Sequence, residues 1–331
     1  MTPLFEPRLL NPPFGDPALY VKLQGEGTAL LFDLGDISRV SAGLLFKITE
    51  VFISHTHIDH FVGIDHLLRL NLARDRILHL YGPPGIIVNM TGKLKGYTWN
   101  LTENYPFMLD VHEIGSRSIK TRRFACRDKF KPGPVQRMPF NGTVVNNPHY
   151  CVKTRQLDHN GIPSLAYRLE EHCHININRD ALNKLGLPVG SWLQTLKKNI
   201  REGCPETTFV SVPMENDSLP KQIPLGELVS QIVHITPGEV IAYVSDCGAT
   251  PSNKKKIRGL ADKADHFFCE AAFLERDHEK ALNRGHLTAW QAGQLARESG
   301  AKRLTAFHFS PRYESLPDEP ATEAMDSFNG K

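Results

Sequence analysis

The sequence of 331 residues predicts a layered α/β sandwich, in which helices cover the outer faces of two sheets. Short apolar runs of strand length alternate with amphipathic segments of helix length over most of the chain. Two sheets with helices outside them would bury these runs. Several runs also end at a histidine or an aspartate, which is where layered α/β proteins usually place their chemistry.

The first half of the chain alternates strands and helices. We expect strands at 28–33, 50–54 and 77–81, the last stopped by Gly82-Pro83-Pro84. Residues 60–74 carry apolar side chains at helical spacing. Further strands are expected within 108–124 and at 150–157 and 163–170.

The second half repeats this order. We expect strands at 240–245, 266–269 and 303–307, and helices at 257–264 and 288–299, the last closed by Gly300. The expected domain covers residues 1–313 and contains an inserted arm at about 175–221. An acidic, proline-bearing tail at 314–331 is expected to be poorly ordered.

The composition is that of an ordinary globular protein, with 40% apolar and 23% charged residues. No apolar run reaches the roughly 18 residues of a membrane span, so no membrane partner is expected. The first 17 residues lack the pattern of a signal peptide. The six cysteines form no C-x-x-C pair, which favours reduced thiols and a cytoplasmic location.

The segment His55-Thr56-His57-Ile58-Asp59-His60 carries the chemistry. It begins where an apolar strand ends, and period-two geometry places His55 and His57 on the same side. Imidazole nitrogens and carboxylate oxygens are ligands that Zn²⁺ and similar ions take. Four such groups within six residues are more than one catalytic ion needs, which indicates two ions.

Further ligands stand where other apolar strands run out. They are His159, Asp246 and His308. An aspartate between two cations can give one oxygen to each. The whole set therefore predicts two divalent ions per chain, with zinc expected and manganese chemically allowed.

This set resembles the metallo-β-lactamase superfamily, and more narrowly its ribonuclease Z branch. The narrower resemblance rests on residues 157–163 (LDHNGIP), 244–248 (VSDCG), 285–288 (GHLT) and 306–313 (AFHFSPRY). It covers about residues 18–313 and implies a four-layer αβ/βα sandwich. It also implies a metal-dependent phosphodiester hydrolase that acts as an endonuclease in tRNA 3′-end processing, and a homodimer.

The resemblance assigns roles to residues of this sequence. One ion is held by His55, His57 and His159, and the other by Asp59, His60 and His308, with Asp246 bridging them. Asp33 supports the histidine segment from behind. The expected catalytic residues are Asp59, His286 as the acid that protonates the leaving group, and Glu270 as its partner. Arg312 and Ser310 are expected to contact a substrate phosphate.

The expected substrate is RNA, in the form of precursor tRNA. Residues 117–137 hold eight basic side chains against one acid, with Phe124 and Phe130 between them, a pattern that suits phosphate contacts and base stacking. Other positions depart from the ribonuclease Z pattern. The loop at residues 11–17 has no lysine or arginine, and residues 269–272 read Cys-Glu-Ala-Ala where that branch has a histidine motif.

Two alternatives therefore stay open. One is a metal-dependent hydrolase of a small phosphodiester or ester with no role in RNA processing. The other is a nucleic-acid-binding protein that keeps the fold without turnover, against which the complete ligand set argues.

Overall fold

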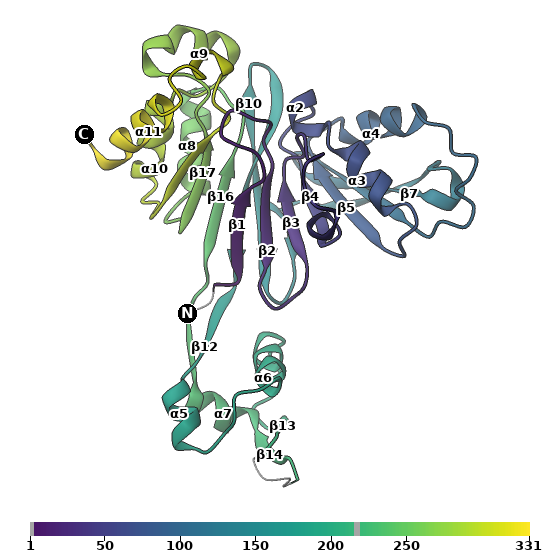
Figure 1. Cartoon of the computed structure of the whole chain (residues 1–331), viewed down its shortest axis with the longest axis vertical. Helices are drawn as coiled ribbons and strands as arrows, with labels where there is room; N and C mark the ends of the chain where they lie inside the picture. The colour runs from purple at the N-terminus through teal and green to yellow at the C-terminus, as the bar shows by residue number, and fades with distance from the viewer. Residues whose placement is uncertain (1–2, 215–218) are drawn as a thin grey trace. The chain divides into compact units, whose positions relative to one another are not determined.

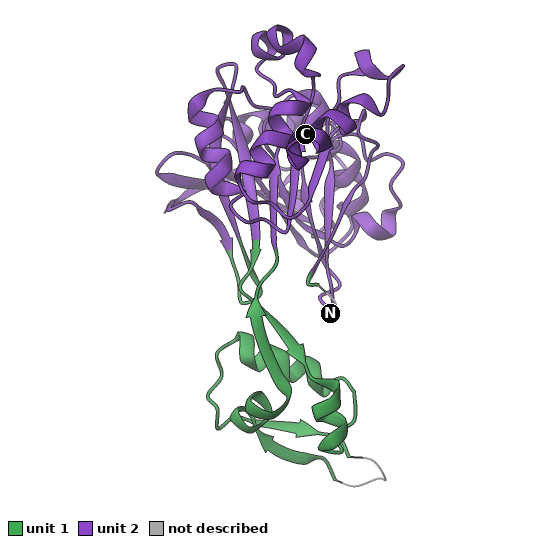
Figure 2. Ribbon diagram, turned by 90° about the vertical axis from the view of Figure 1, so that its left-hand side faces the viewer, with its two compact units in different colours: residues 1–4, 146–151, 170–239 green, residues 5–145, 152–169, 240–331 purple. Residues whose placement is uncertain are grey.

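The computed structural model describes residues 3–214 and 219–331. Residues 1–2 and 215–218, which fall in the expected domain and the expected arm, lie outside the described residues. The chain divides into two compact units (Figure 2). The large unit comprises residues 5–145, 152–169 and 240–331, and the small unit comprises residues 1–4, 146–151 and 170–239.

The first sheet of the large unit contains eight strands among the described residues, in the order of the chain. They are β1 (Phe5–Leu9), β2 (Leu19–Leu23), β3 (Ala29–Phe32), β4 (Ile48–Phe52), β5 (Ile77–Gly82), β6 (Met108–Ile114), β7 (Ser118–Ala125) and β8 (Pro132–Pro139). The central strands β3 to β6 run parallel, and the outer pairs run antiparallel.

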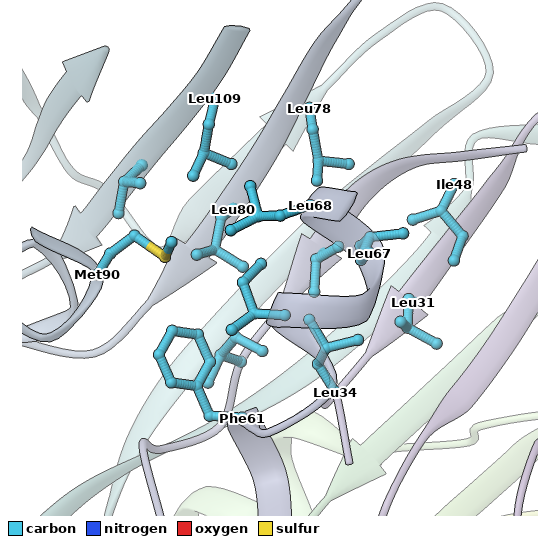
Figure 3. Close-up of a cluster of buried hydrophobic side chains, with 14 of the residues drawn as sticks. Leu31, Leu34, Ile48, Phe61, Leu67, Leu68, Leu78, Leu80, Met90 and Leu109 are labelled. Carbon is cyan, nitrogen blue, oxygen red and sulfur yellow. The ribbon is translucent and has the colours of Figure 1, made fainter. Parts of the chain in front are cut away.

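Helices cover one face of this sheet. They are α1 (Ala42–Leu45), α2 (Ile58–Phe61), α3 (Ile64–Asn71) and α4 (Ile86–Lys95). Leu67 and Leu68 of α3 pack against Leu78 and Leu80 of β5 in a fully apolar cluster (Figure 3). Alternate residues of β5 therefore face the helices, as the period of two requires.

The single helix expected at 60–74 is wrong, because the chain forms two helices with a break at Val62–Gly63. A side chain at Gly63 would place its Cβ 2.3 Å from the carbonyl oxygen of Gly35. The N–H of Gly63 donates to the carbonyl of Leu34 at 2.9 Å. This close backbone approach anchors the histidine segment against the loop that follows β3.

The second sheet has the order β18–β17–β16–β11–β10–β9. Its strands are β9 (Thr143–Asn146), β10 (Tyr150–His159), β11 (Ile162–Glu171), β16 (Val240–Val244), β17 (His266–Glu270) and β18 (Leu304–Phe307). Its helices are α8 (Pro251–Leu260), α9 (His278–Arg284), α10 (Ala289–Glu298) and α11 (Glu319–Asn329). Of these, α8, α10 and α11 lie beside the sheet, on its side away from the first sheet (Figure 1).

N-terminal capping residues mark where α8 and α10 begin. The side chain of Thr250 accepts from the N–H of Asn253, and Pro251 stands at the first turn, so α8 begins before the expected residue 257. Thr288 and Gln291 form a capping box at the start of α10.

Aromatic side chains fill the space between the two sheets. Phe32 and Phe52 of the first sheet stack with ring centroids 5.0 Å apart. Tyr167 of β11 lies 5.8 and 5.5 Å from these rings, and Tyr243 of β16 lies 5.7 Å from Phe32. The order helix, sheet, sheet, helix confirms the predicted four-layer αβ/βα sandwich.

The small unit replaces the expected arm at 175–221 with a longer segment from residue 170 to residue 239. Strands β12 (Cys173–Ile177) and β15 (Val233–Pro237) pair antiparallel, as do β13 (Phe209–Val212) and β14 (Lys221–Pro224). Helices α5 (Arg179–Lys184), α6 (Trp192–Arg201) and α7 (Leu225–Ile232) contribute to its own apolar core, which includes Trp192, Leu196 and Leu228.

The expectation of a poorly ordered tail at 314–331 is wrong. Helix α11 packs closely on α10, because Gly293 leaves room that a side chain would fill: its Cβ would lie 2.1 Å from the carbonyl oxygen of Ala324. Ala324 and Ser327 are fully buried, and the hydroxyl of Ser327 donates to the carbonyl of Trp290 at 2.8 Å. Within the described residues, every helix is too short or too polar to cross a membrane.

Candidate metal centre

The predicted site residues gather where strands of the two sheets end. In the first sheet, β3 leads to Asp33 and its parallel neighbour β4 leads to the segment that begins at His55. In the second sheet, β10 ends at His159. The parallel strands β16, β17 and β18 lead to Asp246, Glu270 and His308.

A first group of side chains offers one ligand atom each within 4.8 Å of one another: His55, His57, His159 and Asp246. Oδ2 of Asp246 lies 3.7 Å from Nε2 of His55 and 3.8 Å from Nε2 of His159. Nε2 of His55 lies 2.9 Å from Nδ1 of His57. Two ligands of a tetrahedral zinc ion lie about 3.3 Å apart, so this spacing suits one divalent ion.

A second group, whose ligand atoms also lie within 4.8 Å of one another, contains Asp59, His60 and His308. Oδ2 of Asp59 lies 3.3 Å from Nε2 of His60 and 3.3 Å from Nε2 of His308. Nε2 of His60 is buried and has no hydrogen-bond partner among the described residues, a deficit that a metal ion would remove. This group therefore also suits a divalent ion.

The two groups meet at Asp246. Its carboxylate lies 3.5 Å from Nε2 of His60 and 2.8 Å from Nδ1 of His308, in addition to its distances from the first group. Asp246 is almost fully buried. One carboxylate thus faces both groups, as a ligand shared by two ions must.

The charges of these groups are strongly coupled. Burial lowers the pKa of His55 to about 2, with a further contribution from His60. Burial alone would also lower the pKa of His308, but Asp246 and Asp59 raise it to about 10. The pKa of Asp246 is held well below its ordinary value by His308 and His60, against the effect of burial. The carboxylates thus attract positive charge, and divalent ions would displace the protons that supply it.

Asp33 holds His60 from the side opposite Asp246. Its carboxylate accepts from Nδ1 of His60 at 3.0 Å and from the hydroxyl of Tyr243 at 2.8 Å. It also accepts from the N–H and the hydroxyl of Ser54 at 2.6 and 2.8 Å. With its Nδ1 proton held in this way, His60 presents Nε2 as a ligand atom.

His159 is oriented in the same manner by a backbone carbonyl. Its Nδ1 lies 2.8 Å from the carbonyl oxygen of Gly285. Gly285 has a φ of +71°, and a side chain there would place its Cβ 2.9 Å from the backbone nitrogen of Asn160. The chain therefore needs a glycine at 285 to bring this carbonyl against the imidazole.

His286 and Glu270 lie beside the metal ligands. Nδ1 of His286 is 2.9 Å from Oε2 of Glu270, and the two imidazoles of His286 and His159 lie 4.9 Å apart. Burial alone would lower the pKa of His286, but Glu270 raises it above the ordinary value. The other carboxylate oxygen of Glu270 accepts from the N–H of Cys247 at 2.7 Å.

The same two side chains form a third candidate group with Asp246 and His308, again within 4.8 Å. The hydrogen bonds of Glu270 leave its carboxylate engaged on both oxygens. The arrangement therefore suits an acid–base pair beside the two ligand groups.

Arg312 and Ser310 follow His308 in the chain, but within the described residues neither forms an ion pair or a hydrogen bond with a candidate ligand. Nη1 of Arg312 lies 3.4 Å from Oδ1 of Asp277, and its guanidinium lies 5.7 Å from the ring centre of Phe273. The ring of Phe273 in turn lies 5.9 Å from that of His286. The N–H of Ser310 donates to the carbonyl of Ala272.

The basic stretch at 117–137 covers strands β7 and β8. Lys120 pairs with Glu113 at 2.7 Å, and Arg123 makes two hydrogen bonds of 2.7 Å to Asp110. The expected base stacking by Phe124 and Phe130 is wrong, because both rings are buried in the core of the first sheet. Phe124 points inward, while its neighbour Arg123 lies on the opposite face of the strand and is exposed.

Three residues that hold the candidate ligands or their neighbours in place were not predicted from the sequence: Ser54, Tyr243 and Asn253. Ser54 stands directly before His55 at the end of a buried strand, a polar position that could have been noticed. Tyr243 lies inside an apolar strand and Asn253 inside a helix. Their partners are far away in the sequence, so no local signal marks them.

The chain is similar in sequence to known proteins. The family model described as a beta-lactamase superfamily domain matches residues 152–309. Ribonuclease Z of Deinococcus radiodurans is 29% identical over 311 residues, covering 92% of this chain and 90% of that protein. Ribonuclease Z of Myxococcus xanthus is 28% identical over 326 residues, covering 95% and 90%.

Solved structures share the fold. The short form of human tRNase Z is 20% identical, with a TM-score of 0.52 and coverage of 94% of this chain and 92% of that one. Unliganded yeast PDE1 is 10% identical, with a TM-score of 0.55 and coverage of 98% and 93%. The chain thus shares the metallo-β-lactamase fold and is similar in sequence to ribonuclease Z.

Proposed function

We propose that this chain is a two-metal phosphodiester hydrolase that cuts the 3′ extension from precursor tRNA as an endonuclease. The observation that carries the proposal is the position of Asp246, whose carboxylate faces both ligand groups. The similarity to ribonuclease Z along nearly the whole chain supports the choice of RNA as substrate.

One zinc ion would be held by His55, His57 and His159. The other would be held by Asp59, His60 and His308, and Asp246 would bind both ions. Ions in such a site lower the pKa of water and offset negative charge on the phosphoryl oxygens. Asp33 and the carbonyl of Gly285 keep the ligand imidazoles of His60 and His159 in place.

His286 would donate the proton that the departing oxygen needs. Glu270 holds the Nδ1 proton of His286, so the opposite nitrogen, Nε2, is the atom that can give a proton to the leaving group. Arg312 and Ser310 would lie along the substrate phosphates, and Arg312 would have to exchange its partner Asp277 for phosphate.

A second candidate function is hydrolysis of a small phosphodiester. It is favoured by the loop at residues 11–17, which has no basic side chain. This loop lies against the segment after His308: the N–H of Phe309 donates to the carbonyl of Pro13, and the rings of Phe14 and Phe309 lie 5.3 Å apart. This loop thus offers no cation to an RNA phosphate beside the second ligand group.

A comparison of two substrates tests the proposal. We expect the protein to release an intact 3′ trailer from a precursor tRNA with kcat/KM far above that for a small aryl phosphodiester, and to lose both activities with a chelator. Asp246→Ala serves as the inactive control. Hydrolysis of the diester alone would support the second function, and RNA binding without cleavage of either substrate would indicate a binding protein.

We also propose a homodimer in the cytoplasm. Ile58, Val62 and Val88 are 78%, 37% and 72% exposed and line one depression of about 560 Å³, an apolar surface that a second copy would cover. Light scattering should give twice the chain mass, and Val88→Lys should lower it. The buried thiols of Cys126, Cys247 and Cys269 are in keeping with a reducing compartment.

A further inference from the structure

A groove of about 940 Å³ runs beside the last half of β10 in the large unit. Its walls come from the turn between β6 and β7, the loop before β9, β10 itself and helix α8. Asp158 and Gly161 line it, and they flank His159 in the chain. The groove therefore adjoins the first group of candidate ligands, and neither the ligands nor His286 line it.

Two cations on the groove are held in place. Nη1 of Arg155 donates to the carbonyl of Thr154 at 2.9 Å, and its guanidinium lies over Gly142, where an added Cβ would be 2.7 Å from Nη1. Nζ of Lys256 on α8 donates to the carbonyl of Gln156 at 2.9 Å. Each bond uses one N–H, so both groups keep donors for a ligand.

The charge of the groove is positive. Within the described residues, neither Arg155 nor Lys256 has an acidic partner within 4.0 Å. Asp158 is the one acid on the wall, and its Oδ1 accepts from the N–H of Gly161 at 3.1 Å, which occupies it in the turn. A half-buried aromatic ring, that of Phe140, also lines the groove.

We propose that this groove binds the single-stranded 3′ trailer of the RNA substrate. The inference rests on the proposed function. Arg155 stands four residues before His159 on an extended strand, so it lies about 13 Å from that ligand. A strand cut at the metal centre can reach Arg155 with the phosphates beyond the scissile bond, and Phe140 offers a face on which a base can stack. A small diester held at the ligands cannot reach this far.

Three variants test the groove: Arg155→Gln, Lys256→Gln and the double variant. Lys255→Gln is the matched control, since Lys255 is an exposed neighbour on α8 that does not line the groove. The readouts are kcat/KM for a precursor tRNA with a long trailer and for one with a single-nucleotide trailer, each at several salt concentrations. Hydrolysis of a small aryl phosphodiester and the melting temperature are measured in parallel.

With the long trailer, the double variant should lose about tenfold or more in kcat/KM at low salt, and the slope of log kcat/KM against log salt should fall by about 1 to 2. With the single-nucleotide trailer and with the aryl diester it should match the wild type, as Lys255→Gln should with all substrates. Equal losses for long and short trailers would overturn the inference, as would an unchanged salt slope. If the wild type cleaves the aryl diester and no precursor tRNA, the proposed function itself fails, and the groove loses its occupant with it.

Discussion

Asn253 binds the backbone of Asp158 on both sides of that residue: its side-chain oxygen accepts from the N–H at 3.0 Å and its Nδ2 donates to the carbonyl at 2.8 Å. The same Nδ2 donates to the carbonyl of Gly248 at 2.8 Å. Asn253 is 1% exposed. A single amide thus joins the residue before His159 to the loop after Asp246, and so ties together two strand ends that carry ligands.

Asn253→Ala should weaken metal binding without touching a ligand. The change removes these three hydrogen bonds, although the carbonyl of Asp158 still accepts from the N–H of Gly248, and it should cost about 2 to 4 kcal/mol in stability. Loss of such support typically lowers metal affinity by about 10- to 100-fold. Competition with a chromogenic zinc chelator measures the affinity. A lower melting temperature with unchanged zinc affinity would show that Asn253 supports only the fold.

The number of bound ions should depend on which ligand is removed. We expect about two zinc ions per wild-type chain, about one for Asp59→Ala, and fewer than one for Asp246→Ala, because only Asp246 faces both groups. Elemental analysis of protein purified without chelator gives these counts. The same count for both variants would remove the bridging role from Asp246, and a wild type without metal would remove the centre.

Replacing the proposed acid should slow the reaction according to the leaving group. His286→Ala should lower kcat for RNA by about 10²- to 10⁴-fold, because the departing ribose oxygen needs a proton. An aryl diester with a good leaving group should lose much less, and the metal count should stay at the wild-type value. Equal losses on both substrates would place the proton donor elsewhere. Glu270→Gln should show the same pattern with a smaller loss.

The metal centre could be predicted from the sequence because its ligands occupy strand ends. Apolar runs mark the strands, and parallel strands of one sheet finish at a common edge, so Asp246 and His308 could be expected near each other although they are far apart in the chain. His55 follows a strand of the other sheet, so its place beside them depends on how the two sheets pack. The supporting residues could not. Asn253 and Tyr243 act through partners 95 and 210 positions away, and nothing beside them in the sequence records that contact.

The errors of the sequence analysis have the same origin. Charge along 314–331 suggested disorder, whereas the small residues Gly293 and Ala324 allow two helices to touch. Phe124 and Phe130 looked accessible between cations, whereas the sheet buries both rings. In each case the charged residues of the segment lie on its exposed face. The structure depends instead on how the residues of its buried face pack.

A histidine far from the proposed chemistry should make stability depend on pH. Burial, with a smaller effect from His79, lowers the pKa of His112 to about 4. Its Nδ1 lies 2.8 Å from the hydroxyl of Thr121, and its ring stacks on Tyr81 at 4.3 Å. The folded protein therefore holds His112 neutral down to a pH at which the unfolded chain has already bound a proton.

His112→Gln should flatten the acid side of the stability profile. In the unfolded chain the histidine pKa is about 6.5, so its neutral, buried form contributes stability fully above that pH. The contribution is lost as pH falls from about 6.5 to about 4, up to about 3 kcal/mol, because only the unfolded state gains a proton. Urea unfolding at intervals of pH measures this for the wild type and the variant, and the difference between them cancels the titration of the metal ligands. His278→Gln, at an exposed position, should follow the wild type. A constant difference between wild type and His112→Gln across this pH range would show that His112 titrates alike in both states.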